Sequence, residues 1–415
     1  MTKKRVLLLL PTTTYRATDF IEAAKRLRVE VTVASETANV LASKNPAGYL
    51  TLDCANIDKA LKQVKEFSAT NPLDAILGAD DQTMILAAYL AKKLGLKGNP
   101  PQSVMISRNK RLLRECLSRN KVPTPNYRVF SVSENPKHIA AKIVYPCVLK
   151  PTTLAASQGV IRADNEGEFI AVWQRILKII WDQKIEQFIL VESFIPGQEV
   201  ALEGIVQNGK LRPLALFDKP DPLNGPYFEE TIYVTPSRLP LKIQEDIFTC
   251  AAKAVEALGL QMGPVHAELR INDEGPWIIE VAARPIGGKC SRALRFNSSI
   301  SLEELILRQA LGMDIDSLKV DVTPSGVMMI PIPKSGVYRG VSGLEKAKAI
   351  AGIEDIVITA PIGKSLVPLP EGSSYLGFIF ARAKTPALVE QSLREAHKIL
   401  EFVIEEDPAV LTRSA

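Results

Sequence analysis

The chain has 415 residues, of which 46% are hydrophobic and 23% are charged, as is usual for a globular protein. This length predicts about two to four domains with enough apolar residues for their cores. The formal net charge of +5 at pH 7 is small, and no basic block stands out. The composition therefore gives no indication of nucleic acid as a partner.

The cysteines and the apolar runs indicate the cellular location to expect for this protein. The cysteines are scattered without a C-x-x-C pair, as expected for reduced thiols in a cytosolic protein: Cys54, Cys116, Cys147, Cys250 and Cys290. The apolar run Val6–Leu10 follows a basic start but stops at Pro11, which is too short for a typical signal core. It fits a buried first strand better. No run approaches transmembrane length, so we expect a cytoplasmic protein with no membrane partner.

Strands and helices alternate from the start of the chain to about Pro101. The expected strands are Val6–Leu10, Val29–Ala34 and Asp74–Leu77, and the expected helices are Asp19–Arg28, Asn56–Ser68 and Gln82–Leu94. This alternation predicts an α/β protein that begins with a doubly wound, Rossmann-like parallel sheet. The first turn, Pro11–Thr14, lacks the dinucleotide glycine fingerprint, which disfavours a nicotinamide cofactor. We expect this region to be a scaffold that forms one wall of a cleft.

Turn-rich segments divide the rest of the chain, at Gly98–Pro101 and around Thr323–Gly326. We expect an N-terminal domain at 1–105, a central domain at 106–311 with a small α/β unit at about 127–190, and a C-terminal α/β domain at 312–415. The elements expected in the last domain are strands Val327–Ile332, Ile356–Thr359 and Leu376–Ala381, and helices Leu344–Ala351 and Pro386–Val403.

The segment His266–Gly288 is the most informative in the chain. Two strand-like runs flank a turn-rich Asn-Asp-Glu-Gly cluster, which predicts a hairpin. If Asn272–Pro276 form its loop, Ile271 pairs with Trp277, and Glu268 lies opposite Glu280. Period-two alternation then places both glutamates on one face and the apolar side chains on the other: Ala267, Leu269, Ile271, Trp277, Ile279 and Val281.

Two carboxylates that face each other favour a cation between them. At ~4 Å they repel by roughly 4 kcal/mol at an effective dielectric of about 20. Mg²⁺ prefers oxygen ligands and is usually held by one or two carboxylates plus substrate phosphates. Arg284 and the Gly287-Gly288 backbone follow, and together these groups suit a phosphorylated anion. The alternative is a register shift by one residue, which leaves two solvated acids on an exposed face.

Two lysines are candidates for contact with such an anion. Lys150 ends the apolar run PCVLKP, where an ammonium is costly unless it reaches a cleft or an anion. The loop that follows, TTLAASQGV, has Ser157 and Gly159 at its tip. This loop can donate backbone N–H groups to phosphates, but an ordinary hairpin turn is an equal alternative. Lys110 starts a helix and borders its apolar stripe, so a snorkelling surface lysine is the alternative there.

The run FILVESFIPGQEV combines a strand, a stiff turn and a second strand. The first strand ends in Glu192, the turn is Ile195–Gly197, and Glu199 begins the second strand. This arrangement can present backbone to an adenine and a carboxylate to ribose hydroxyls. Taken alone, this run predicts only a hairpin.

These motifs, in this order, resemble the ATP-grasp superfamily. They are Lys110, PCVLKP, AASQGV, VESFIPGQEV, HAELR and IIEVAARPIGG, and they span most of residues 1–311. The resemblance implies an ATP-grasp fold with a lid at about 127–190, two lysines and a closing loop on the ATP phosphates, an adenine hinge and an acid on the ribose. The ATP-binding residues that it implies are Lys110, Lys150, Ser157, Gly159, Val160, Glu192, Ser193, Ile195 and Glu199.

The resemblance also implies a metal site and a catalytic arginine. Glu268 and Glu280 match the ligands of Mg²⁺, for which Mn²⁺ is an alternative. Arg284 matches the arginine that steadies an acyl-phosphate or tetrahedral intermediate, and it acts with Lys150. Many members carry Asn two residues after the second metal acid, where this chain has Ala282, so one or two metal ions remain possible. The closing loop is also poorer in glycine than usual.

Within the superfamily, the form EVAAR and the C-terminal runs GVMMIPIPKSGVYRGVSG and YLGFIFARA look most like the L-amino acid ligase branch. The long segment Leu216–Pro240 is rich in proline and aromatic residues, and loops of this length are usually functional or disordered. By position in this branch, Glu230 receives an amine, with Glu229 as the neighbouring alternative and ordinary surface acids as the rival. The expected substrate residues are Glu230, Arg284, Gly287 and Gly288.

The expected protein is an ATP-dependent carboxylate–amine ligase. ATP phosphorylates a carboxylate, and an amine displaces phosphate from the acyl-phosphate to form an amide. The partners are a small carboxylate and a small amine, with amino acids the expected class, and we expect a homo-oligomer, with a dimer as the expected form. Two alternatives stay open, namely a carboxyphosphate-forming carboxylase that uses bicarbonate and an ATP-binding sensor without turnover.

Overall fold

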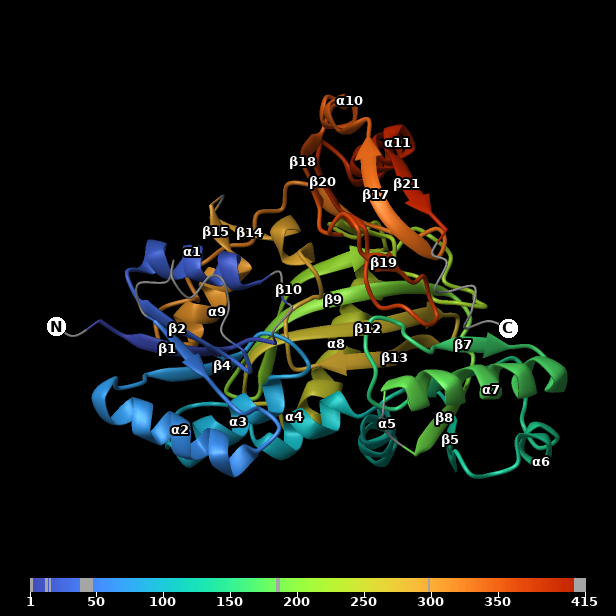
Figure 1. The fold of residues 1–415 in the computed structure, drawn as a ribbon, viewed down its shortest axis with the longest axis horizontal. Coiled ribbons are helices and arrows are strands. Elements are labelled where there is room, and N and C mark those ends of the chain that lie inside the picture. The colour runs from blue at the N-terminus through green and yellow to red at the C-terminus, as the bar shows by residue number, and fades with distance from the viewer. Residues whose placement is uncertain are drawn as a thin grey trace.

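The computed structural model describes residues 3–11, 14, 16–37, 48–183, 187–297 and 299–406, with the side chains of 182 and 183 excepted. Figure 1 shows three units around a central sheet: the N-terminal unit in blue, a green unit at the lower right, and the C-terminal unit in orange and red at the top. The predicted turn Pro11–Thr14 lies partly outside the described residues.

The N-terminal unit contains a four-stranded parallel sheet, in the order β3-β2-β1-β4. The strands are β1 (Arg5–Leu9), β2 (Glu30–Ser35), β3 (Tyr49–Thr51) and β4 (Ala75–Gly78). The predicted doubly wound sheet is confirmed, whereas the short edge strand β3 was not expected. Because β1 lies inside the sheet, its unbroken apolar run is buried on both faces.

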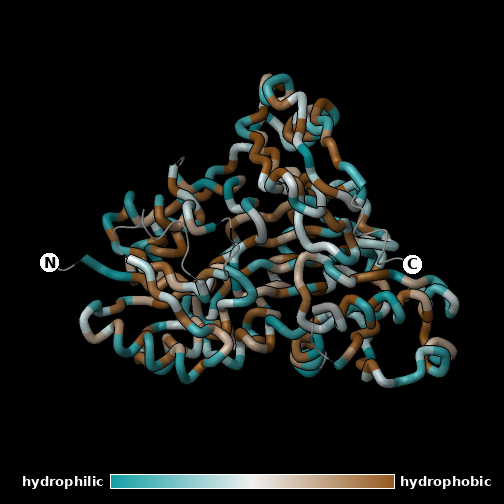
Figure 2. The backbone as a smooth tube through the Cα atoms, viewed as in Figure 1, coloured by the Kyte–Doolittle hydropathy of each residue, from teal (hydrophilic) through white to brown (hydrophobic). Residues whose placement is uncertain are grey.

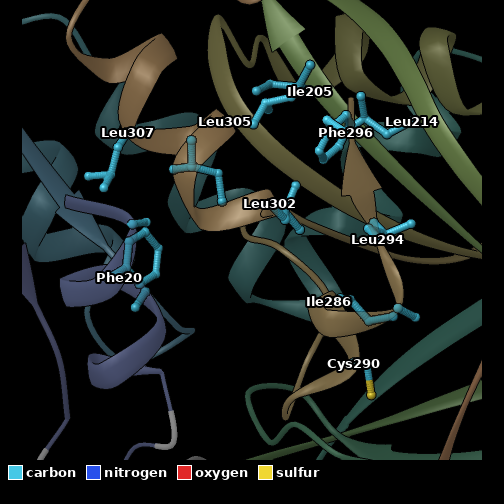
Figure 3. Packing of buried hydrophobic residues seen from close by; sticks show 14 of the residues in the cluster. Phe20, Ile205, Leu214, Ile286, Cys290, Leu294, Phe296, Leu302, Leu305 and Leu307 are labelled. Carbon is cyan, nitrogen blue, oxygen red and sulfur yellow. The ribbon is translucent and has the colours of Figure 1, made fainter. Parts of the chain in front are cut away.

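The two faces of β1 belong to different cores. Val6 and Leu8 pack toward one pair of helices, and Leu7 and Leu9 pack toward the other pair. The first pair is α1 (Ala17–Leu27) and α9 (Leu302–Ala310), and the second is α2 (Ile57–Thr70) and α3 (Met84–Lys93). Figure 3 shows Phe20 of α1 close to Leu307 of α9. This packing attaches the N-terminal unit to residues almost 300 positions later in the chain.

Two helices connect the N-terminal unit to the central region: α4 (Pro101–Arg108) and α5 (Lys110–Arg119). Helix α4 was not predicted, since only a boundary was expected there, although Pro101 at its first position is a common helix start. The side chain of Asn109 caps α5 by accepting hydrogen bonds from the backbone N–H groups of Arg111 and Leu112 at 3.0 and 3.1 Å. This cap fixes Lys110 as the first residue of α5.

The unit at about 127–190 is a four-stranded antiparallel sheet, in the order β5-β8-β6-β7, with α6 (Pro136–Ala140) and α7 (Glu166–Gln183). Its strands are β5 (Tyr127–Ser131), β6 (Cys147–Pro151), β7 (Ile161–Ala163) and β8 (Phe188–Ser193). Phe169 and Trp173 of α7 are fully buried, with stacked rings 6.0 Å apart. The unit therefore has its own core.

An eight-stranded sheet forms the centre, in the order β13-β12-β9-β10-β11-β16-β20-β18. Its strands are β9 (Gln198–Gln207), β10 (Lys210–Asp218), β11 (Ile232–Thr235), β12 (Met262–Asn272), β13 (Gly275–Ala282), β16 (Ser325–Ile330), β18 (Ile353–Ile358) and β20 (Gly377–Arg382). Helix α8 (Leu241–Leu258) packs against β10 and β13. Strands from both sides of the expected domain border at residues 311 and 312 belong to this one sheet. The border itself stays a prediction.

The remaining elements complete the C-terminal half. They are η2 (Cys290–Ala293), β14 (Arg295–Phe296), β15 (Ile300–Ser301), β17 (Gly336–Ser342), α10 (Leu344–Lys348), β19 (Ser365–Leu366), α11 (Pro386–Ile399) and β21 (Glu401–Glu405). The predicted helix Pro386–Val403 was wrong at its end, because the chain becomes extended after Ile399 and pairs with β17. Phe402 and Ile404 lie opposite Val341 and Tyr338, and this tertiary pairing overrides the helical spacing of the apolar residues.

Hydropathy follows this architecture. Figure 2 shows hydrophobic residues along the inner strands, while the outer helices alternate between hydrophilic and hydrophobic residues. Among the residues that the structure describes, no helix combines the length and the apolar character needed to cross a membrane.

Candidate active site

A cavity of about 310 Å³ lies where these units meet. Its walls come from the N-terminal unit, the unit at about 127–190, the central sheet and the C-terminal unit. Of the predicted site residues, all but Gly159 line it: Lys110, Lys150, Ser157, Val160, Glu192, Ser193, Ile195, Glu199, Glu230, Glu268, Glu280, Arg284, Gly287 and Gly288.

The hairpin of β12 and β13 places Glu268 directly opposite Glu280, as the sequence predicted. The predicted loop was wrong, because Ile271 pairs with Pro276 rather than with Trp277. A β-bulge between Glu268 and Leu269 compensates for this shift, with Ile279 as the extra residue of β13.

The bulge also changes which side chains are buried. The predicted apolar face included Trp277 and Ile279, but both are only partly buried. Ile278 is fully buried in their place, in the same core as Leu269 and Val281. Strict alternation fails here because one extra residue reverses the faces along the strand.

Lys219, just after β10, connects three acids of the cavity. Its Nζ lies 2.8 Å from Oε1 of Glu199 and 3.4 Å from Oε1 of Glu268, and it also contacts Glu230. Burial alone would lower the pKa of Lys219, but the three carboxylates raise it well above its ordinary value. Burial raises the pKa of Glu230 to about 7, and Glu268 adds to this shift. Sequence reasoning missed Lys219, although it shares with Lys150 a position at the end of an apolar strand.

His266 is the second cation beside Glu268. Its Nε2 lies 3.1 Å from Oε1 of Glu268, and its Nδ1 contacts Glu203, whose other oxygen accepts a hydrogen bond from the backbone N–H of Ile286 at 3.0 Å. Burial alone would lower the pKa of His266, but Glu203 and Glu268 raise it to about 10. Burial opposes ionisation of Glu268, yet Lys219 and His266 hold its pKa well below the usual range. Glu268 is therefore a carboxylate at neutral pH.

This region offers a metal several carboxylate oxygens. Ligand oxygens of Glu199, Glu230 and Glu268 all lie within 4.8 Å of one another, and the single ammonium of Lys219 forms ion pairs with all three. Glu280, the register partner of Glu268, lies 3.6 Å from Nζ of Lys110. Carboxylates in this arrangement fit a hard cation such as Mg²⁺ or Mn²⁺. Ala282 contributes no oxygen.

The two predicted lysines are buried in the cavity wall. Lys110 is 6% exposed and donates to the carbonyl of Leu154 at 2.6 Å, so the alternative of a surface lysine was wrong. Lys150 Nζ lies 2.6 Å from Oε2 of Glu192, and burial lowers its pKa. Arg114 pairs with the same carboxylate through Nε at 2.6 Å. Arg114, which lies on the buried face of α5, was not predicted from the sequence.

The loop between β6 and β7 closes over this end of the cavity. The hairpin alternative for this loop holds in part, since β6 and β7 do pair. Its tip, however, contacts the C-terminal unit. The N–H of Gly159 donates to the backbone carbonyl of Pro370 at 2.9 Å, and the side-chain amide of Gln158 donates to the backbone carbonyl of Glu371 at 2.6 Å. Gly159 has φ +70°, and an added Cβ would lie 2.9 Å from Pro151. This position therefore favours glycine.

The segment from Glu192 to Glu199 links two sheets rather than forming a hairpin. Strand β8 pairs with β5 and β6, while β9 pairs with β10 and β12. The backbone N–H groups of Ser193 and Phe194 donate to carbonyls of Asn126 and Pro146. Apolar side chains line the cavity next to this linker: Val148, Val160, Ile195 and Ile279.

Arg284 lies between the hairpin and the N-terminal unit. Its Nε donates to Oδ2 of Asp81 at 2.8 Å, and its Nη1 donates to the carbonyl of Pro285 at 3.1 Å. Burial alone would raise the pKa of Asp81, but Arg284 and Arg108 lower it. Sequence analysis missed Asp81, because its partner in the site lies about 200 residues away.

Three family models match successive parts of the chain. An ATP-grasp N-terminal domain matches residues 21–98, an ATP-grasp domain matches residues 143–293, and an L-amino acid ligase C-terminal domain matches residues 328–405. The chain belongs to the ATP-grasp superfamily. The predicted family and fold are thereby confirmed.

An L-amino acid ligase, a dapdiamide synthase and an alanine–anticapsin ligase are among the similar proteins. The crystal structure of an L-amino acid ligase from Bacillus licheniformis has a TM-score of 0.80 and 26% identity, over 98% of this chain and 100% of that one. Dapdiamide A synthase from Enterobacter agglomerans is 27% identical over 83% of this chain and 82% of its own length. Alanine–anticapsin ligase from Bacillus subtilis is 25% identical over 62% of this chain, and the match spans 58% of that relative. The expected class of ATP-dependent ligase agrees with these matches.

Proposed function

We propose that this ATP-grasp protein is an ATP-dependent carboxylate–amine ligase that forms an amide or peptide bond through an acyl-phosphate. The observation that carries the proposal is one cavity that is lined by Lys110, Lys150, Arg284 and the opposed acids Glu268 and Glu280. Cations on a phosphate chain, acids for a metal and a guanidinium at the acyl centre are the groups that phosphoryl transfer to a carboxylate requires.

ATP is the expected cosubstrate. Lys110 and Lys150 bind its phosphates, and the loop with Ser157, Gly159 and Val160 covers them. The apolar side chains around Ile195 enclose the adenine. Because the N–H groups of Ser193 and Phe194 already have partners, we infer that carbonyl oxygens and the backbone of Ile195 read the adenine edge.

The acid assigned to the ribose, Glu199, and the acid at the adenine hinge, Glu192, both have cationic partners. Glu199 is held by Lys219 and by Arg270, whose Nη1 lies 3.6 Å from its Oε2, so its carboxylate is oriented for ribose hydroxyls. Glu192 positions Lys150 through their ion pair, which places the ammonium before ATP arrives. Such prior orientation lowers the cost of ordering the site during reaction.

Glu268 and Glu280 would hold Mg²⁺, with Mn²⁺ as an alternative. When bound, the ion neutralises charge that develops on the transferred phosphoryl group. Lys219 and His266 keep Glu268 ionised for this purpose. The side chain of Ala282 has no oxygen and adds no ligand to this site.

The chemistry then needs two displacements. A carboxylate oxygen attacks the γ-phosphorus and ADP leaves; the amine nitrogen attacks the acyl carbon, phosphate leaves, and the nitrogen loses a proton. Arg284 holds the substrate carboxylate and the negative charge of the tetrahedral intermediate, next to the open backbone of Gly287 and Gly288. Glu230 receives the ammonium of the amino substrate. The cavity volume suits small molecules such as amino acids.

Two expectations about the whole protein stay predictions. We expect a homo-oligomer, with a dimer as the expected form, and light scattering tests this oligomeric state. A cytosolic location is supported by the cysteines, all five of which are free thiols.

A screen of amino acid pairs with ATP and Mg²⁺ tests the proposed function through phosphate release and mass analysis of products. The proposal expects release that depends on both a carboxylate and an amine. Release that requires bicarbonate but no amino acid would instead support a carboxylase. Tight ATP binding without hydrolysis in any mixture would support a sensor.

A further inference from the structure

Arg16, at the N-terminus of α1, is a buried cation in the wall of the same cavity. Its side chain is 5% exposed, and its Nη1 has no hydrogen-bond acceptor within the described part of the chain. Its Nη2 makes one long contact, 3.5 Å from the carbonyl of Pro285. A buried charged donor without an acceptor is unfavourable, so such a group needs an explanation.

Three other arginines of the described residues have a buried nitrogen without an acceptor, but their situation differs. Arg114, Arg270 and Arg382 also bury one nitrogen without an acceptor, but each forms an ion pair with a carboxylate. Within the described residues, Arg16 forms no such pair. Its positive charge therefore lacks the direct compensation that the other three have.

A second cation lies close to Arg16. Burial lowers the pKa of Arg16; Glu303 opposes this shift, and Arg284 adds to it. Asp80 lines the same part of the cavity and, like Glu303, opposes the lowering of the Arg16 pKa, but its Oδ1 accepts from the backbone N–H of Gln82 at 3.2 Å rather than from Arg16. Both guanidinium groups reach the carbonyl of Pro285, Arg16 through Nη2 at 3.5 Å and Arg284 through Nη1 at 3.1 Å. Two cations therefore lie at one end of the cavity, and anionic groups of a ligand placed there would compensate them.

Building on the proposed function, we propose that Arg16 is a specificity residue that binds a second, non-reacting carboxylate of the substrates. The carboxylate to be activated must lie beside Arg284 and the acids of the hairpin. Arg16 therefore takes another carboxylate, either the α-carboxylate of the amine substrate or the side-chain carboxylate of an acidic amino acid. Amides that have the same shape but no charge bind poorly at this position.

The experiment compares the turnover of a substrate that carries the carboxylate with that of the matching amide. It is done with the wild type, Arg16→Lys, Arg16→Gln and the control Arg26→Gln. Arg26 lies on the same helix, but its side chain is 46% exposed and pairs with Glu304 away from the cavity. The substrate comparisons are L-alanine against L-alaninamide, and L-glutamate against L-glutamine. The first tests an α-carboxylate and the second a side-chain carboxylate. Thermal melting establishes that each variant is folded.

We expect the wild type and Arg26→Gln to prefer the carboxylate in one comparison, as measured by kcat/KM. Arg16→Gln should lose about tenfold to hundredfold of this preference, the value of a charged hydrogen bond, and Arg16→Lys should lose part of it. A purely structural role would reduce turnover of acid and amide alike. An unchanged preference in the folded Arg16 variants, or no preference in the wild type, overturns the proposal.

Malonate binding, measured by calorimetry, tests Arg16 without turnover. Weaker binding to Arg16→Gln than to the wild type and Arg26→Gln supports the anion site, and equal binding to all three overturns it. If the wild type turns over no substrate pair, the proposed function fails, while the malonate comparison still decides the role of Arg16.

Discussion

Glu268 and Glu280 face each other across the β12–β13 hairpin because Ile279 is an extra residue in β13. Regular pairing continued from Leu269 and Ile278 would place Ile279 opposite Glu268 and turn Glu280 toward the core. The bulge instead directs Glu280 into the cavity. Bulges commonly redirect a side chain next to an active site.

The metal role of this pair is tested by Glu280→Gln. A neutral amide coordinates Mg²⁺ more weakly, so we expect ADP formation to fall by about a hundredfold or more with little change in melting temperature. Glu274→Gln, at the exposed turn of the same hairpin, is the matched control and should retain turnover. Near-normal turnover in folded Glu280→Gln would rule out the metal role.

Nucleotide choice tests the assignments of the adenine hinge and Glu199. The hinge should select adenine, and Glu199 should select the ribose hydroxyls, so we expect ATP to be preferred over GTP and deoxy-ATP by about tenfold or more. The measurement is kcat/KM for each nucleotide with one fixed substrate pair. Comparable values for all three would contradict both assignments.

Binding of ATP with Mg²⁺ should also order the unit at about 127–190. Arg175 of this unit forms a bidentate pair with Glu371 of the C-terminal unit at 2.5 and 2.9 Å, so a closed arrangement is available. We expect limited proteolysis of this unit to slow on addition of ATP and Mg²⁺. Equal cleavage rates with and without nucleotide would contradict a closing lid.

Arg284 and Glu230 should affect different kinetic constants. Arg284→Lys keeps the charge but loses the planar fork, so it should slow amide formation much more than it weakens ATP binding. Glu230→Gln should mainly raise the KM for the amino substrate. Single-turnover rates and ATP titrations separate these effects. Loss of ATP affinity in Arg284→Lys with an unchanged chemical step would move the arginine to the nucleotide site.

The Asp81–Arg284 pair predicts a pH effect on stability. The pKa of Asp81 lies below its ordinary value of 3.8, because Arg284 and Arg108 outweigh burial. Its contribution is therefore present above about pH 4 and is lost as the pH falls through the lowered pKa. We expect Asp81→Asn to reduce the free energy of unfolding by about 2 kcal/mol at pH 7. This difference from the wild type should shrink in acid, and a pH-independent difference would contradict the ion-pair account. Asp273→Asn, in an exposed turn, is the control.

Local patterns predicted the features that depend on neighbouring residues. The buried run of β1, the hairpin and the lysine at the end of β6 were all visible in the sequence. The exact faces of β13 were not, because a bulge leaves no clear mark in an apolar run such as Trp277–Ile279. The end of α11 was also missed, since pairing of β21 with β17 depends on a distant strand.

The cavity residues that were not predicted from the sequence were missed for a different reason. Lys219, Asp81 and Arg16 each gain a role only when the fold brings distant residues beside them. Lys219 contacts acids from β9, β12 and the loop before β11. No spacing rule within one segment could have identified these contacts.

Transfer of oxygen from the carboxylate to phosphate is the most direct test of the acyl-phosphate mechanism. The substrate carboxylate is labelled with the heavy oxygen isotope, and the released phosphate is examined by mass spectrometry during turnover with ATP, Mg²⁺ and an amine. The account predicts that each phosphate carries one oxygen from the substrate carboxylate. Amide formation with unlabelled phosphate would contradict it.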